Sequence, residues 1–452
     1  MTTLHFDTLL LPTGWTDGVT VDIASDGTIS AVRGGTTPPA GAERQAIGLP
    51  GLANLHSHAF QRGMAGLAEV AGPSKDSFWT WRQVMYRFLD RLTPEDVEAI
   101  AAELYVEMLE AGFTSVGEFH YLHHAPDGGW YDDPAEMAGR IATAALKTGI
   151  GLTLLPVFYG QGGLGGKPTE HQQRRFASSA DSFGRLVEGA RRHLAGLPHA
   201  RLGIAPHSIR AVTPESLGAV TGAFADGPIH IHAAEQTKEV EDCLAWSGRR
   251  PVEWLIEHAG VGPRWCLIHA THMTEAETVA LAGSGAVAGL CPITEANLGD
   301  GIFPGTAYLG AGGALGVGSD SHVRVDLAEE LRLLEYGQRL RDRSRNVFGR
   351  EGQSSGRLLL EAALAGGAKA LQRPSGAIET GAVADIVALD PEHRALVAAR
   401  GDRIIDGWIF AGDQTAVSAV WVAGRKVVAE GRHVDREPIR ARFSRTMRRI
   451  LA

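Results

Sequence analysis

The stretch LPGLANLHSH, residues 49–58, ends a short apolar run with two histidines, His56 and His58. Residues two apart in a β-strand point to the same face, so we expect both imidazoles to aim at one point beyond the end of the strand. Two convergent neutral imidazoles suit a borderline-soft metal ion such as zinc. Alone, the pair fits a structural interpretation equally well, in which one ring bonds the backbone and the other is solvated.

Three later segments have the same form, in which an apolar run ends in a residue type that can bind a metal. They are HIHAAE (residues 230–235), IHATH (268–272) and GVGSDSH (316–322). Chance placement of four such endings is improbable. The pattern therefore favours a metal site built from the C-terminal ends of several strands.

Strands and helices alternate between about residues 49 and 375. Strands are predicted near residues 52, 113, 150, 201, 228, 265, 286 and 314. Apolar strands separated by helices indicate a parallel sheet covered by helices, and eight such units predict an α/β fold of the (β/α)8 barrel type. That barrel places its chemistry at the C-terminal strand ends. A doubly wound open sheet is the alternative, but it would hardly bring ligands from the first and last strands to one metal.

Both ends of the chain carry strand-turn-strand patterns, with Ser25-Asp26-Gly27 as one of the turns. A short β segment cannot bury much core alone, so we expect the two ends to pair. The predicted division is a small β-sandwich domain from residues 1–48 and 376–435, a barrel from residues 49–375, and a C-terminal helix over residues 436–452. Thr93-Pro94 and Thr213-Pro214 each predict a helix start, with an N-cap followed by proline.

Composition narrows the classes of function. With 44% hydrophobic and 21% charged residues, the 452-residue chain has the make-up of a soluble globular protein, and its net charge of −9 argues against nucleic acid as a partner. No apolar run reaches the roughly 18 residues that span a bilayer, and no basic segment precedes the first apolar residues. We therefore expect a cytoplasmic protein without a membrane partner, with a homodimer as the default assembly. The three scattered cysteines predict neither disulfides nor a thiolate zinc site.

Several of these segments together resemble the amidohydrolase superfamily, over essentially the whole chain. They are PGLANLHSH, HIHAAE, HATH, GSDSH and GAVADIVALD. The resemblance implies that the metal ligands are His56, His58, His232 and Asp320. It also implies that Glu235 shuttles protons and that His269 polarises the substrate. Binuclear members carry a bridging lysine at the end of the fourth strand, and RLGIAPHS (201–208) has none, so one Zn²⁺ per subunit is expected, with Fe²⁺ as an alternative.

The chemistry of these residue types agrees with that implication. Three neutral nitrogens and a carboxylate leave an open position for water on a divalent ion. Glu235 can take a proton from that water and pass it to a leaving nitrogen. Asp320 would both ligate the metal and orient the water, which makes it a catalytic residue as well as a ligand. We expect three further histidines, His230, His272 and His322, to have supporting roles.

Within the superfamily, AFQRGMAG (59–66), FWTWR (78–82), the Tyr121 segment and HSIR (207–210) resemble the formimidoylglutamate deiminase branch. The resemblance implies hydrolysis of the C–N bond of a linear amidine, N-formimidoyl-L-glutamate, to N-formyl-L-glutamate and ammonia in histidine degradation. It implies that the glutamate portion is held by Gln61, Arg82, Tyr121, His207 and Arg210.

Independently of the resemblance, two arginines, Arg82 and Arg210, suit a small dicarboxylate through bidentate pairs, although each could instead neutralise a local acid. The alternatives are an aminopurine, pterin or other nucleobase deaminase, a chlorohydrolase of the same superfamily, and a non-catalytic metal-binding scaffold. The scaffold hypothesis predicts that working acids are missing, yet Glu235, His269 and Asp320 are all present.

Overall fold

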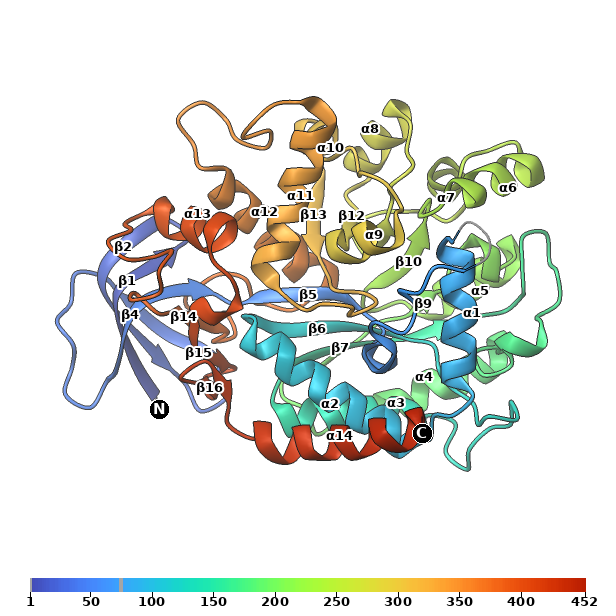
Figure 1. The fold of residues 1–452 in the computed structure, drawn as a ribbon, viewed down its shortest axis with the longest axis horizontal. Coiled ribbons are helices and arrows are strands. Elements are labelled where there is room, and N and C mark those ends of the chain that lie inside the picture. The colour runs from blue at the N-terminus through green and yellow to red at the C-terminus, as the bar shows by residue number, and fades with distance from the viewer. Residues whose placement is uncertain (1, 73–75) are drawn as a thin grey trace.

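The computed structural model describes residues 2–72 and 76–452, and it shows an α/β body beside a strand-rich sheet (Figure 1). The body is a ring of parallel strands covered by helices, with the strand-rich sheet at one side. Among the described residues, no helix combines the length and the apolar character that crossing a membrane would need. The fold class expected from the sequence is confirmed.

The barrel strands occupy the eight predicted positions, and the fourth is split in two. Their bounds are β5 (Leu52–Ser57), β6 (Phe113–His120), β7 (Gly151–Phe158), β8 (Arg201–Leu202), β9 (Ala205–Pro206), β10 (Ile229–Ala233), β11 (Trp265–His269), β12 (Val287–Leu290) and β13 (Ala314–Val317). Two parallel arcs, one from β5 to β9 and one from β10 to β13, form the wall. Parallel bridges close the ring, between Ser57 and Asp320 on one side and between Ile204 and Ile229 on the other.

Helices cover the outside of this ring. They are α1 (Phe78–Leu89), α2 (Pro94–Glu110), α3 (Glu136–Thr148), α4 (Ala180–Leu194), α5 (Pro214–Ala223), α6 (Thr237–Ser247), α7 (Pro251–His258), α8 (Glu275–Ser284), α9 (Pro292–Leu298), α10 (Gly305–Gly310), α11 (Leu327–Asp342) and α12 (Ser355–Leu371). Short 3₁₀ turns are η1 (Ala59–Met64), η2 (His171–Gln173), η3 (Ile209–Ala211) and η4 (Gln414–Ala416). Thr93 and Thr213 cap α2 and α5 by accepting hydrogen bonds from backbone N–H groups, as their sequence predicted.

The two chain ends form one antiparallel-rich sheet. Its strands are β1 (Thr2–Leu11), β2 (Gly14–Ile23), β3 (Ile29–Arg33), β4 (Glu43–Pro50), β14 (Ile386–Leu389), β15 (Val417–Val422), β16 (Arg425–Ala429) and β17 (Arg432–His433), in the order β17-β16-β15-β14-β4-β1-β2-β3. The rings of Phe6 and Trp421 lie 6.4 Å apart, although three strand spacings of about 4.8 Å separate β1 from β15 along the sheet. The sheet therefore bends around its own core, and the two layers expected of a sandwich are halves of one continuous sheet.

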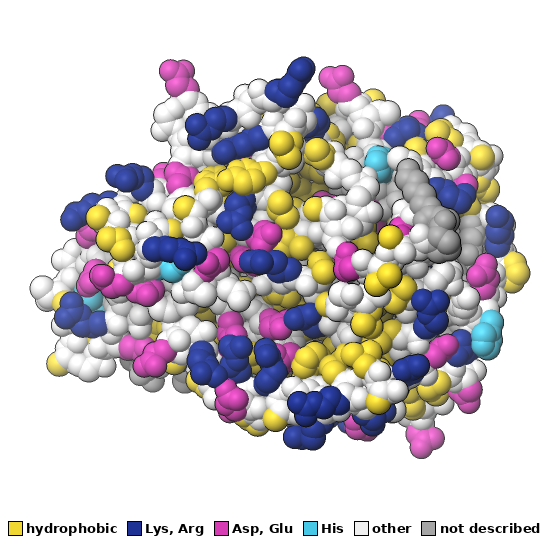
Figure 2. All heavy atoms as spheres, in the orientation of Figure 1, with side chains coloured by type: hydrophobic (Ala, Val, Ile, Leu, Met, Phe, Trp, Pro, Cys, Tyr) yellow, Lys and Arg dark blue, Asp and Glu magenta, His cyan; other side chains and the backbone are white. Residues whose placement is uncertain are grey.

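The last helix, α14 (Arg436–Leu451), lies along α2 (Figure 1). Four of its arginines form ion pairs with acids of α2, in the pairs Arg436–Glu110, Arg440–Glu103, Arg442–Glu98 and Arg449–Asp96. Figure 2 shows basic and acidic side chains gathered along this edge of the molecule. The basic character of the C-terminal segment thus matches the acids of a neighbouring helix. One further helix, α13 (Asp402–Ala411), lies between β14 and β15 in the sequence and packs against α12.

A buried ion pair joins the barrel to the terminal sheet. Arg373, just after α12, lies with Nε 3.2 Å from Oδ2 of Asp385, and both side chains are almost wholly buried. Arg373 also donates to the carbonyl of His199, and Asp385 accepts from the N–H of Ala423 in the turn between β15 and β16. The pair therefore connects the end of α12 and the segment before β8 with the start of β14.

We predict that Arg373→Ala lowers the free energy of unfolding by about 3–5 kcal/mol, because it leaves the Asp385 carboxylate buried without its counter-charge. Urea denaturation followed by circular dichroism measures the change. The control is Arg44→Ala, whose partner Asp7 lies 3.4 Å away with both side chains more than half exposed. That variant should lose less than about 1 kcal/mol, and equal losses in the two variants would contradict the prediction.

Candidate active site

The candidate site lies where four barrel strands end. His56 stands near the end of β5, His232 near the end of β10, His269 at the end of β11, and Asp320 three residues beyond β13. At the last two positions the backbone has a positive φ, 67° at His269 and 47° at Asp320, and Ala234 beside Glu235 has 51°. Non-glycine residues seldom adopt this conformation, and where they do it is often at functional sites. The sharp turns here aim these side chains back over the barrel mouth.

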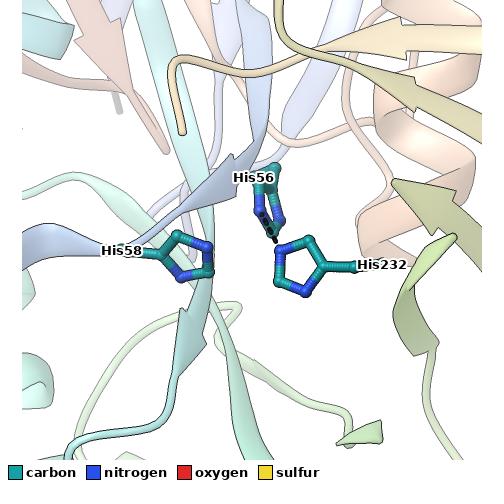
Figure 3. Close-up of side chains that lie close together, drawn as sticks. All are labelled: His56, His58 and His232. Atoms are coloured by element: carbon teal, nitrogen blue, oxygen red, sulfur yellow. Dashed lines mark hydrogen bonds between the residues drawn. The ribbon is translucent and has the colours of Figure 1, made fainter. Parts of the chain in front are cut away.

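The three predicted imidazole ligands converge, as Figure 3 shows. The Nε2 atoms of His56 and His232 are 3.1 Å apart, and the ligand atoms of all three rings, including His58, lie within 4.8 Å of one another. Nδ1 of His58 bonds the carbonyl of Phe119 at 2.8 Å, and Nδ1 of His232 bonds the carbonyl of His207 at 2.9 Å. A carbonyl only accepts, so each Nδ1 carries the proton and each Nε2 lone pair faces the cluster.

The environment keeps these rings neutral. Burial, and then the neighbouring histidines, hold the pKa of His56 and of His232 well below the usual range. Burial lowers the pKa of His58 to about 3. Neutral imidazole is the form that binds a metal ion, so the protonation state and the geometry agree.

Asp320 completes the set of predicted ligands. Its Oδ1 lies 3.4 Å from Nε2 of His58 and 3.6 Å from Nε2 of His56. Three neutral nitrogens and one carboxylate, all buried and converging, fit a single divalent metal ion with a position left open. The structure therefore brings together all four residues that the sequence named as ligands.

His269 and Glu235, the two other predicted catalytic groups, lie beside this cluster. Nε2 of His269 is 3.8 Å from Oε1 of Glu235 and 3.8 Å from Oδ2 of Asp320. Nδ1 of His269 is 3.2 Å from Oε1 of Glu295, a contact that the sequence did not predict. Burial lowers the pKa of His269, but the charges of Glu235, Glu295 and Asp320 outweigh it and raise the pKa to about 10.

The expected supporting histidines lie around the ligands. The His322 ring accepts the N–H of His58 at 3.2 Å and contacts the Ser319 hydroxyl at 2.9 Å, so it ties the first strand to the last. The His230 ring, two positions before His232 on β10, bonds the carbonyl of Ala370 in α12 at 2.8 Å. The backbone of His272 bonds Ala234, which fixes the turn before Glu235.

A cavity of about 780 Å³ opens above the cluster. Its floor includes His58, His232, Glu235, His269 and Asp320. All five predicted substrate-binding residues line it, namely Gln61, Arg82, Tyr121, His207 and Arg210. Sequence reasoning did not single out four further lining residues: Tyr159, Gln173 and Phe176, which follow β7, and Trp246, which lies in α6.

The two arginines face this cavity without a close carboxylate partner. Nε of Arg82 donates to the Tyr86 hydroxyl at 2.7 Å, and among the described residues no carboxylate oxygen lies within 4.0 Å of Arg82. Nε of Arg210 is 4.0 Å from Oε2 of Glu239 and makes no hydrogen bond to a described residue. Both guanidinium carbons lie 5.7 Å from the ring centroid of Trp79. Neither guanidinium group forms a hydrogen bond to a carboxylate of the described residues, so both can bind an anionic ligand.

Gln61 and Tyr121 form a buried pair between α1 and the cluster. The Gln61 amide donates to the Tyr121 hydroxyl at 2.7 Å, and the Tyr121 ring meets the edge of His58 with centroids 4.9 Å apart. The His207 ring lies at the same distance from His232. These three residues thus form the wall that adjoins the metal ligands.

Comparisons with known proteins agree with this geometry. The model of the amidohydrolase family matches residues 47–427. Formimidoylglutamate deiminase from Pseudomonas aeruginosa is 52% identical over 454 residues, with 100% of both chains covered. A 5-methylthioadenosine/S-adenosylhomocysteine deaminase from Natronomonas pharaonis is 29% identical over 76% of this chain and 74% of its own.

Two solved structures extend the comparison. An amidohydrolase from Brucella melitensis has a TM-score of 0.97 and 53% identity, covering 100% of each chain. An adenosine deaminase from Xanthomonas campestris, with bound zinc, has a TM-score of 0.83 and 23% identity over 100% of this chain and 98% of its own. At that identity the second likeness supports the fold alone.

We predict that purified protein binds one divalent metal ion per chain and that His232→Ala loses most of it, because one of three imidazole ligands is removed. Elemental analysis of the dialysed protein measures the ratio of metal to chain. The matched control is His230→Ala on the same strand, whose ring bonds Ala370 and is not part of the histidine cluster. Wild-type metal content in His232→Ala, or equal loss in the control, would contradict the prediction.

Proposed function

The chain belongs to the amidohydrolase family, and on that premise we propose that it hydrolyses N-formimidoyl-L-glutamate to N-formyl-L-glutamate and ammonia, with one zinc ion per chain. The observation that carries the proposal is the placement of two arginines and a buried histidine cluster in one cavity, with no hydrogen bond from either arginine to a carboxylate of the described residues. The full-length similarity to the deiminase from Pseudomonas aeruginosa supports the same conclusion.

The substrate suits this cavity at both of its ends. N-formimidoyl-L-glutamate carries two carboxylates at one end and an amidine at the other. Two guanidinium groups, those of Arg82 and Arg210, match two carboxylates through charge-assisted hydrogen bonds. With the carboxylates held there, the amidine would face the cluster that contains Glu235 and His269. The pair of Gln61 and Tyr121, with His207, would fill the space between the two ends.

The metal would be held by the four converging residues described above. Their nitrogen and oxygen donors suit zinc and also tolerate iron. When bound, such an ion supplies the positive charge that acidifies the attacking water. The buried, neutral state of the three imidazoles fits that ion, and the protonated Nδ1 atoms of His58 and His232 leave their Nε2 lone pairs free to bind it.

The chain's own residues would move the protons of the reaction. Water adds to the amidine carbon, the C=N bond becomes single, and Glu235 accepts the proton that the water loses. Glu235 returns this proton to the former imino nitrogen, which becomes an amino group. Glu235 then accepts the hydroxyl proton of the tetrahedral intermediate and passes it to the amino nitrogen, the C–N bond to that nitrogen breaks, and ammonia leaves as the C=O bond forms. His269, whose Nε2 faces Glu235 and Asp320, would stabilise the oxygen of the tetrahedral intermediate.

A nucleobase deaminase or chlorohydrolase of the same family is the second candidate. The aromatic residues Phe78, Trp79 and Tyr159 around the cavity favour it, because rings of this kind stack on a flat base. The arginine pair opposes it, since a neutral base offers no partner for two positive charges. For this reason we propose the dicarboxylate as the substrate in preference to a nucleobase.

The proposal extends to the biological setting. A formimidoyl group on glutamate is the remnant of an opened imidazole ring, so this reaction belongs to histidine breakdown. We propose a cytoplasmic homodimer as the working form, on the acidic composition and on the frequency of two-fold assemblies among soluble enzymes. Light scattering in solution tests the dimer directly.

Ammonia release tests the substrate. We predict that the zinc-loaded protein releases ammonia from N-formimidoyl-L-glutamate far faster than from guanine, adenosine or cytosine, because only the amidine carries two carboxylates. A coupled glutamate dehydrogenase assay measures the initial rates, and a sample treated with a chelator is the control. Faster release from any of the bases would overturn the substrate while leaving the metal chemistry in place.

Glu235→Gln tests the proton transfer. The amide keeps the size of the side chain but cannot accept a proton, so we expect kcat to fall by about 10²–10⁴-fold. The metal content should stay at the wild-type value, because Glu235 lies outside the proposed ligand set. A parallel variant, Glu241→Gln on the nearby helix α6, should retain wild-type turnover. Retained activity in Glu235→Gln would exclude the proposed role.

A further inference from the structure

The imidazole of His269 has its two nitrogens in different surroundings. Its Nε2 points toward Glu235 and Asp320, at 3.8 Å from each, and forms no hydrogen bond with a described residue. Its Nδ1 lies 3.2 Å from Oε1 of Glu295. The residue itself has φ 67° at the end of β11, so the backbone turns sharply at the point from which the ring extends.

Glu295 is held in place by its own neighbours. It lies in α9, directly after β12, and its side chain is buried. Its Oε1 also accepts the N–H of Cys291 at 2.9 Å, while its backbone N–H donates to the carbonyl of Cys291 at 2.8 Å. The backbone of Asp300 then bonds the carbonyl of Glu295. These hydrogen bonds therefore fix the Glu295 carboxylate beside the C-terminal end of β12, the seventh barrel strand.

A fixed acceptor on Nδ1 has a definite effect on an imidazole. Rotation about χ2 of histidine is soft, with two broad orientations that exchange the nitrogens for ring carbons. A carboxylate that accepts the Nδ1 hydrogen selects one orientation and one ring face, as partners of this kind do for histidines in metal sites. In this protein, the selected orientation is the one that turns Nε2 toward Glu235.

We propose that Glu295 is a positioning residue for the reaction, which acts by holding the His269 ring with Nε2 toward Glu235 and Asp320. The role of His269 in turnover rests on the proposed function, whereas the hydrogen bond does not. Glu295 is not itself among the residues that line the cavity or form the histidine cluster, and it contacts the lining residue His269. Its effect is therefore expected on the chemical step and not on substrate affinity.

The donor atoms of His269, Cys291 and Glu295 lie within 4.8 Å of one another, which would also suit a second metal ion. The hydrogen bonds of Glu295 favour the positioning role, because its Oε1 is already shared by the N–H groups of His269 and Cys291.

Kinetics of Glu295→Ala and Glu295→Gln test the proposal. We expect Glu295→Ala to lower kcat by about 10–100-fold with KM nearly unchanged, and Glu295→Gln to recover most of the loss, because its amide oxygen still accepts the Nδ1 hydrogen. The matched control is Glu330→Ala, which removes another buried carboxylate that bonds α9, at the N–H of Ile293. That control should disturb α9 without the same loss of kcat.

A double-mutant cycle separates positioning from general destabilisation. If Glu295 acts through His269, then Glu295→Ala should cause no further loss of kcat when His269 is already replaced by Asn. An additional loss as large as in the wild-type background would overturn the proposal. A rise in KM that accounts for the loss, or equal effects in Glu330→Ala, would do the same.

Nuclear magnetic resonance of ¹⁵N-histidine-labelled protein gives a readout that does not depend on turnover. The Nδ1–H signal of His269 is identified by its disappearance in His269→Asn. It should vanish or move strongly in Glu295→Ala and persist in Glu330→Ala and Glu295→Gln. An unchanged signal in Glu295→Ala would overturn the hydrogen bond. If wild-type protein releases no ammonia from N-formimidoyl-L-glutamate, the proposed function fails, and this signal still decides the contact.

Metal analysis completes the test. Glu295→Ala should hold as much metal as the wild type, because Glu295 is outside the ligand set. Two ions per chain in the wild type and one in Glu295→Ala would assign His269, Cys291 and Glu295 to a second metal site. That result would overturn the positioning role.

Discussion

The closure of the barrel between its first and last strands is the constraint on which the whole site depends. The N–H of Asp320 bonds the carbonyl of His56 at 3.0 Å, and the N–H of His58 bonds the carbonyl of Asp320 at 3.3 Å. These two backbone bonds set the carboxylate beside the two imidazoles. The approach is close, since a Cβ on Gly318 would lie 2.6 Å from the backbone nitrogen of His56. Only glycine lets the last strand come near enough.

Around this closure, backbone and side-chain partners fix the rings of His58, His232 and His269. Carbonyls take the Nδ1 hydrogens of His58 and His232, a carboxylate takes that of His269, and His322 ties the two ends of the ring together. A site assembled in this way needs little rearrangement when a ligand arrives, which is the condition for strong electrostatic stabilisation. The positive groups proposed for the substrate, Arg82 on α1 and Arg210 on η3, line the same cavity. Neither forms a hydrogen bond to a carboxylate of the described residues, so both charges are available to the substrate.

The terminal sheet serves the site indirectly. β4 ends at Pro50 and β5 begins at Leu52, so the sheet leads almost without interruption into the strand that carries His56. The N–H of Gly51 bonds the carbonyl of Asp385, and the side chain of that residue pairs with Arg373 after α12. The buried pair of Arg373 and Asp385 thus fixes the start of β5 relative to the C-terminal end of α12. The sheet is part of the scaffold that aims the first ligand.

Local patterns in the sequence determined the strand ends, the eight repeated units and the ligand-type residues at the strand ends. These follow from alternation, capping and spacing, which act between residues a few positions apart. The roles of the catalytic acid and of the substrate-binding residues were implied by the resemblance to the amidohydrolase superfamily. The contact of Glu295 with His269, the placement of Trp79 between two guanidinium groups, and the bending of the terminal sheet were decided only by the tertiary structure. Glu295 lies 26 positions from His269, and no periodicity links a helix residue after one strand with the ring at the end of the preceding strand. Such contacts depend on how the closed ring sets the strands side by side, because packing between distant segments has no local signature.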